Sequence, residues 1–198
     1  MKNILQPELV EKSLTKKEFL NNITIKNYQE CKSTDGIAYS ADIYYKGKFV
    51  CDIIEEGRGG ELKINPYSQV SKDKWEFDNT INAIFKTINK DDLYVTTKIK
   101  TQNGNFFNYI QDLDSLLIEA VDDYCAKKDF KKIQKKGIVL ATDKKLEYTI
   151  LSWDNLTIPT FLKKYKNAKD VIQKEITKIK DKEDILNKEY LMSLGFTF

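Results

Sequence analysis

Three glycines surround the single arginine of the chain in the segment Gly57-Arg58-Gly59-Gly60. Glycine adopts positive φ angles without strain, so such a turn exposes backbone N–H groups that cradle an anion, with Arg58 as a further donor. A plain hairpin loop is the alternative, because the segment lacks the Lys-Ser/Thr pair of a P-loop and joins two predicted strands. We take Gly57, Arg58, Gly59 and Gly60 as a candidate contact for an anion or a partner protein.

Two carboxylates and a lysine flank this turn, since Asp52 precedes it and Glu61-Leu62-Lys63 follows it. If residues 57–60 form a hairpin loop, Asp52, Glu61 and Lys63 share one face of the sheet. The three residues resemble the D…(D/E)-x-K pattern of restriction-endonuclease-like nucleases. The resemblance implies two carboxylates that hold Mg²⁺ and a lysine that positions water. Solvated strand charges are the alternative that we favour, because Glu-x-Lys arises by chance in a chain rich in both residues.

A lysine-rich segment covers residues 127–136, which hold six lysines against one aspartate. The lysines are Lys127, Lys128, Lys131, Lys132, Lys135 and Lys136. Such a patch suits the phosphates of nucleic acid or an acidic protein surface. Phe130 and Ile133 keep helical spacing between the lysines, so a solvated helix face is the alternative. Because the patch has no arginine, we expect no base-specific readout.

Aromatic residues and cysteines offer weaker signals. Tyr44 and Tyr45 lie on a predicted hairpin and suit a partner groove or base stacking, although aromatic strand residues usually belong to the core. Cys31, Cys51 and Cys125 are widely spaced and odd in number. That pattern predicts reduced thiols in a cytoplasmic protein rather than disulfides or a zinc site.

Composition limits the chemistry further. The chain of 198 residues contains no histidine, which removes the usual general base near neutral pH and the commonest nitrogen ligand of zinc. Its formal charge is +3, from 33 basic and 30 acidic residues, so binding to nucleic acid must come from local patches. We expect no cofactor and no metal. With no long apolar run, we also expect no membrane partner and a cytoplasmic location.

The elements that position these residues follow from the pattern between residues 36 and 67. Two β-rich runs, 36–45 and 48–56, flank Lys46-Gly47, and a third run over 61–65 follows the glycine turn. Alternation over residues 23–31 predicts a strand before them. The sequence therefore predicts an antiparallel β-meander.

Helical periodicity appears outside the meander. We expect helices over residues 8–20, 77–88 and 107–134, a strand over 91–100 that reaches a turn at 102–105, a hairpin of 138–142 and 146–153 across residues 143–145, and a helical region to the C-terminus. These elements predict an α+β fold with helices packed on one face of the sheet. We assign residues 1–153 to an α+β core and 154–198 to a helical cap of the same domain.

The segment Asp42–Val50 with Gly57–Gly60, and the tail Ile185–Gly195, resemble the uncharacterised small proteins of phages and mobile elements in low-GC bacteria. The resemblance implies an accessory or counter-defence protein that acts by binding. Together with the absence of a strong catalytic motif, it favours a non-enzymatic inhibitor of a bacterial defence protein. The alternatives are the Mg²⁺-dependent nuclease and a lysine-mediated, non-specific nucleic-acid-binding protein.

Overall fold

The structure is a computed structural model that describes residues 13–66, 81–100, 106–142, 147–181 and 184–198. The chain divides into two compact units, Met1–Tyr124 and Cys125–Phe198. Among the described residues, none of the helices combines the length and the apolar character that crossing a bilayer requires.

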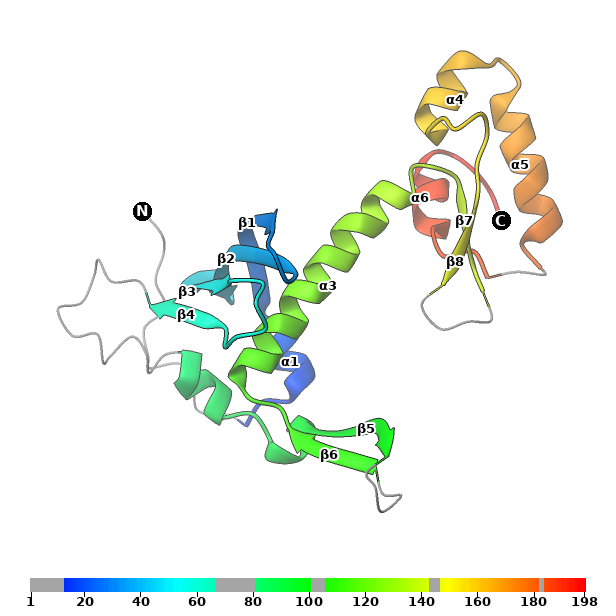
Figure 1. The fold of residues 1–198 in the computed structure, drawn as a ribbon. Helices are drawn as coiled ribbons and strands as arrows, with labels where there is room; N and C mark the ends of the chain where they lie inside the picture. The colour runs from blue at the N-terminus through cyan, green and yellow to red at the C-terminus, as the bar shows by residue number, and fades with distance from the viewer. Residues whose placement is uncertain (1–12, 67–80, 101–105, 143–146, 182–183) are drawn as a thin grey trace. The chain divides into compact units, whose positions relative to one another are not determined.

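The first unit contains a four-stranded antiparallel sheet in the order β1-β2-β3-β4 (Figure 1). Its strands are β1 (Ile23–Lys32), β2 (Ile37–Tyr45), β3 (Lys48–Glu55) and β4 (Lys63–Pro66). Lys46 and Gly47 have φ angles of 48° and 78°, which give the twist that a two-residue hairpin turn requires. The predicted meander and the α+β class are therefore confirmed.

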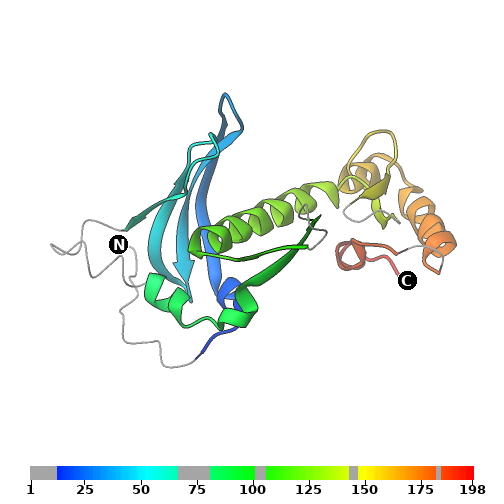
Figure 2. The same cartoon turned by 60° about the horizontal axis from the view of Figure 1, so that its bottom comes forward.

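One face of this sheet is covered by the first half of α3 (Leu113–Ile133) (Figure 2). Three cross-strand neighbours on this face are buried, namely Ile25, Ile43 and Cys51. From α3, Leu117 is fully buried, and the ring of Tyr124 lies 5.6 Å from that of Tyr28 on β1. We call this the inner face of the sheet and the opposite one the outer face.

α1 (Lys16–Asn21) starts later than the predicted helix over residues 8–20, of which residues 8–12 lie outside the described part of the chain. A capping box fixes its start. Thr15 Oγ1 accepts a hydrogen bond from the Glu18 backbone N at 3.1 Å, and Glu18 Oε2 accepts one from the Thr15 backbone N at 2.8 Å. Within the predicted helix over 77–88, residues 81–86 are helical, and residues 77–80 lie outside the described part.

The prediction of a helix from residue 107 is wrong for its first residues. Residues 106–110 form β6 (Phe106–Ile110), which pairs with β5 (Tyr94–Lys100), and β5 follows a short 3-10 helix, η2 (Lys90–Leu93). Aromatic and β-branched residues favour a strand here. The helix begins only after Asp112, whose Oδ1 accepts a hydrogen bond from the Ser115 backbone N at 2.8 Å and caps α3. The turn predicted at 102–105 lies outside the described residues.

The second unit contains a hairpin and three helices. The hairpin consists of β7 (Ile138–Ala141) and β8 (Tyr148–Leu151), and the helices are α4 (Ile158–Lys164), α5 (Ala168–Ile179) and α6 (Lys188–Ser193). Gly137 directly precedes β7, at a position where no other residue fits, because a Cβ atom there would lie 2.0 Å from the Leu151 carbonyl oxygen. The hairpin and the helical C-terminal region agree with the sequence prediction, whereas the turn at 143–145 lies outside the described residues.

The core of the second unit explains where the two units divide. Ile138 and Leu140 of β7 are buried in one cluster with Ile172 and Ile176 of α5. The hairpin therefore belongs with the C-terminal helices, whereas the sequence predicts a core over residues 1–153 and a cap over 154–198. The division falls after Tyr124, within α3, because only the first part of that helix carries fully buried side chains of the first unit.

Candidate functional site

The outer face of the sheet carries a row of polar side chains across all four strands. Its members are the cross-strand neighbours Lys26, Asp42, Asp52 and Asn65. Asn27 sits at a β-bulge with a φ of 51°, and its Nδ2 donates a hydrogen bond to Asp42 Oδ2 at 2.8 Å. Asn65 Nδ2 donates to Asp52 Oδ2 at 3.2 Å. Two amides thus hold two carboxylates that face each other across β2 and β3.

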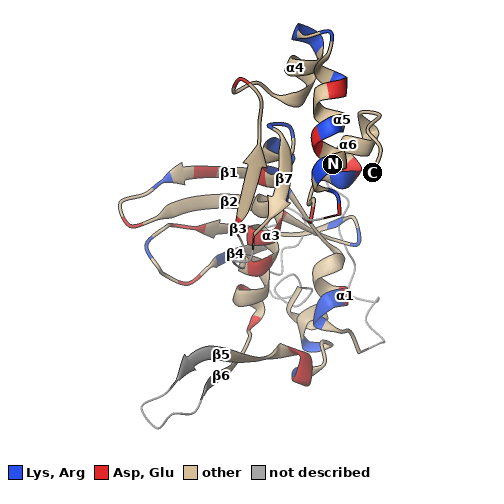
Figure 3. Cartoon of the chain, turned by 90° about the vertical axis from the view of Figure 1, so that its right-hand side faces the viewer, with Lys and Arg blue, Asp and Glu red and all other residues tan. Residues whose placement is uncertain are grey.

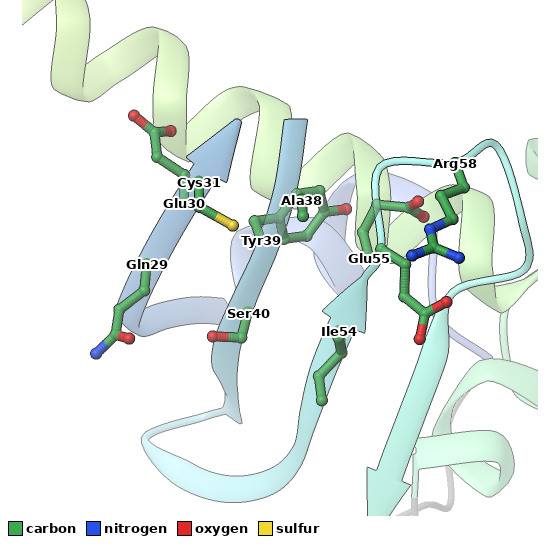
Figure 4. Close-up of a pocket in the computed structure, with 10 residues that line it drawn as sticks. Gln29, Glu30, Cys31, Ala38, Tyr39, Ser40, Ile54, Glu55 and Arg58 are labelled. Atoms are coloured by element: carbon green, nitrogen blue, oxygen red, sulfur yellow. The ribbon is translucent and has the colours of Figure 1, made fainter. Parts of the chain in front are cut away.

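Beside this row lies a groove of about 470 Å³, which we call the outer groove (Figure 4). Ala38 and Ser40, both small, project from the central strand β2 to form its floor, with Ile54 of β3 beside them. Gln29 and Cys31 border it on β1. The remaining lining residues are Glu30, Tyr39, Glu55, Glu56 and Arg58. The groove exists because small side chains on β2 lie between longer ones on both sides.

The glycine turn closes one end of this groove. Gly57 has a φ of 68°, and a Cβ atom there would lie 2.8 Å from the Ala38 backbone N, so the turn packs directly on β2. Its N–H donates to Glu55 Oε1 at 3.0 Å and is therefore not directed at an external anion. Figure 4 shows Arg58 extending beside Glu55. These contacts fit a hairpin loop, from which Arg58, Gly59 and Gly60 remain exposed.

The three residues of the nuclease pattern have different partners. Asp52 is held by Asn65, and Lys63 forms an ion pair with Glu56 instead. The Lys63 contact, followed by the charge of Arg58, lowers the pKa of the Glu56 carboxyl. Glu61 lies outside β4, near the start of α3.

Glu61 lies close enough to Asp114 of α3 for its charge to affect the pKa of the Asp114 carboxyl. Burial, then the charges of Asp112 and Glu61, raise the pKa of the Asp114 carboxyl. Asp52 and Lys63 thus share the outer face, as the predicted register requires, whereas Glu61 lies outside β4. Within the described ranges, no group of three acidic or cysteine side chains is arranged to hold a metal ion.

Both tyrosines that were candidates for partner binding belong to the core. Tyr44 is 9% exposed and packs edge-on against Phe49 with ring centroids 5.6 Å apart, and Tyr45 is 4% exposed and lies 5.9 Å from Phe19. The sequence analysis instead missed Ile54, which is 36% exposed on the outer face. Alternation from the buried Cys51 and Ile53 is the signal that could have identified it.

All six lysines of the basic segment are exposed, on the last turns of α3 and the turn that follows. Lys132 Nζ pairs with Asp129 Oδ1 at 2.8 Å, and this hydrogen bond lowers the pKa of the Asp129 carboxyl. The segment therefore forms an exposed surface of six lysines that contains one acidic residue, Asp129.

A second hollow of about 600 Å³ lies beside α1. Lys16 Nζ reaches Glu119 Oε2 at 2.8 Å and Gln111 Oε1 at 2.7 Å, and Gln111 Nε2 donates to Glu119 Oε2 at 3.1 Å. Because these groups satisfy one another, we interpret this network as structural.

Comparisons of the chain with protein-family models, with curated proteins and with solved structures found no match.

Proposed function

We propose that the protein is a non-enzymatic binding protein whose outer groove accepts an extended segment of a partner protein. The observation that carries this proposal is the floor of Ala38, Ser40 and Ile54, an open strip of small and apolar side chains beside the row of polar residues on the outer face. The groove covers about three residues on each of three strands, or about 7 Å along the strands and about 10 Å across them. Those dimensions suit two or three residues of an extended chain.

The lining favours an apolar residue in that segment. Glu30 and Glu55 pair in register with Tyr39, so their side chains belong to the inner face, and Glu30 accepts a hydrogen bond there from the Tyr28 hydroxyl. At the outer groove, the carboxylate of Glu56 is compensated by Lys63 and Arg58. An apolar side chain of the partner would lie on the floor and remove its apolar surface from water.

The setting of this interaction follows from the resemblance to phage and mobile-element proteins. In a bacterial cytoplasm, the partner would be a host defence protein, which binding alone would inhibit. No catalytic step is required of the groove, whose exposed thiol, Cys31, has no histidine to activate it in this chain.

Ile54→Arg tests the proposal, with Ile110→Arg as the matched control. Both isoleucines are exposed on strands of the first unit, at 36% and 53%, but only Ile54 lines the groove. The probe is a displayed library of short random peptides. We expect wild type and Ile110→Arg to enrich the same peptides with apolar residues, and Ile54→Arg to bind them at least about tenfold more weakly, a difference of about 1.4 kcal/mol.

Peptides that bind all three proteins equally, or that are enriched in charged rather than apolar residues, would refute the groove. Capture from a host lysate then extends the test to natural partners. A host protein retained stoichiometrically by wild type and Ile110→Arg but lost by Ile54→Arg would identify the target.

A further inference from the structure

The two units carry formal charges of opposite sign, which sum to the net charge of +3. Residues 125–198 contain 17 lysines against 10 acidic residues, a formal charge of +7, whereas residues 1–124 contain 16 basic against 20 acidic residues, a charge of −4. The basic character of the chain is thus confined to the second unit.

Within the second unit, the lysines concentrate at the end of α3. Residues 127–136 hold six exposed lysines and one acidic residue. Along α5, by contrast, basic and acidic residues alternate (Figure 3), and Lys178 Nζ pairs with Glu175 Oε1 at 2.6 Å. No other ten-residue stretch of the second unit has as high a formal charge as the +5 of residues 127–136. We call the six lysines the α3 basic face.

The arrangement of this face points to a particular ligand. Lys127 and Lys131 are four residues apart on α3, which places them about 6 Å apart along its axis, and Lys135 follows in the turn after the helix. The neighbouring apolar residues, Phe130 and Ile133, are partly buried. The face lacks the exposed aromatic or apolar anchor that a protein interface or a membrane surface uses, and it offers only point charges.

We infer that the α3 basic face binds the phosphate backbone of nucleic acid without sequence specificity. Lysine ammonium groups neutralise phosphates and release counterions, which supplies this kind of affinity by itself. The second unit contains no arginine, the residue whose forked geometry most often reads guanine. The inference does not depend on the outer groove, which lies entirely in the first unit.

The test compares two double variants with equal changes of charge. Lys131→Glu with Lys135→Glu alters the basic face, and Lys86→Glu with Lys90→Glu alters two exposed lysines of the first unit at the same four-residue spacing. Fluorescence anisotropy measures the binding of a labelled DNA duplex and of an RNA duplex of the same sequence. Four phosphate contacts predict that affinity for the DNA falls about 150-fold between about 50 and 200 mM salt.

We expect the variant of the basic face to bind at least about tenfold more weakly at low salt, with a salt slope smaller by about 2. The control variant and Ile54→Arg should bind as wild type does. Lys131→Gln with Lys135→Gln removes the charge without reversing it, and circular dichroism verifies folding of each variant. Since duplexes of both kinds carry the same phosphates, binding of either one supports the inference.

Three results would overturn it. Equal losses in the two double variants would show that net charge alone is responsible. Stronger binding to polyglutamate than to a duplex of equal charge would indicate an acidic protein, and stronger binding to vesicles of anionic lipid would indicate a membrane. Absence of duplex binding at low salt would remove the inference altogether.

Discussion

We expect the replacement of Asn187 by alanine to destabilise the second unit strongly. The side chain is 2% exposed and makes three hydrogen bonds. Its Oδ1 accepts from the Val139 backbone N at 3.0 Å, and its Nδ2 donates to the carbonyl oxygens of Gln134 at 3.1 Å and Gly137 at 2.8 Å. One side chain before α6 thereby holds the end of the α3 region and the first strand of the hairpin together.

The expected loss for Asn187→Ala follows from the groups left behind. Val139 and Gly137 are buried, and the substitution removes a hydrogen-bond partner from the N–H of the first and the carbonyl of the second. An unsatisfied buried polar group costs about 1–3 kcal/mol, so for these two groups we expect a decrease of about 2–6 kcal/mol in the free energy of unfolding. A domain is stable by only about 5–15 kcal/mol, so this loss would be close to unfolding the unit.

Urea unfolding followed by Trp153 fluorescence measures this decrease. Trp153 stacks on Phe161 in the second unit at 5.7 Å, and a Trp75→Phe background removes the other tryptophan. Asn167→Ala is the control, because Asn167 also precedes a helix, is exposed, and makes no side-chain capping bond within the described residues. The control should lose less than about 0.5 kcal/mol. If Asn187→Ala loses no more than Asn167→Ala, the three-bond network does not stabilise the unit as argued.

Two further predictions concern titratable groups of the first unit. Burial above all raises the pKa of the Cys51 thiol to about 12, so iodoacetamide should alkylate the exposed Cys31 and spare Cys51 until urea unfolds the protein; equal rates in mass spectra would contradict this. Hydrogen bonds from the Ser115 hydroxyl and N–H lower the pKa of Asp112, so its stabilisation is complete above the unfolded pKa of about 4 and is lost as the pH falls further. Asp112→Ala should therefore cost about 1 kcal/mol in thermal unfolding at neutral pH and less in acid; a loss that does not change with pH would contradict the cap.

The sequence pattern was sufficient to predict those parts of the fold that depend on residues close together in the chain. The Lys46-Gly47 turn and the strands β1 to β3 around it were predicted from the sequence and are observed. Each depends on residues a few positions apart, because a hairpin turn fixes the register of the strands that it joins.

The sequence predictions were wrong where contacts with a second strand or helix determine the local structure. Residues 107–110 continue the apolar pattern of the following helix, and only their pairing with β5 makes them a strand. Tyr44 and Tyr45 occupy adjacent strand positions, of which alternation alone would leave one outside. A bulge between β2 and β3, where the register shifts at Ile43 and Tyr44, accompanies the burial of both. The sequence contains no direct signal for that bulge.

The two proposed binding surfaces show the same dependence on distant contacts. Ala38 and Ser40 form a groove floor only because β1 and β3 place longer side chains on both sides of them. The α3 basic face belongs to a strongly positive unit only because Ile138 and Leu140 are buried with the C-terminal helices, which sets the division within α3. A division after residue 153 would have left these lysines in a nearly neutral core. The charge on each unit is therefore a result of core packing, and composition alone could not supply it.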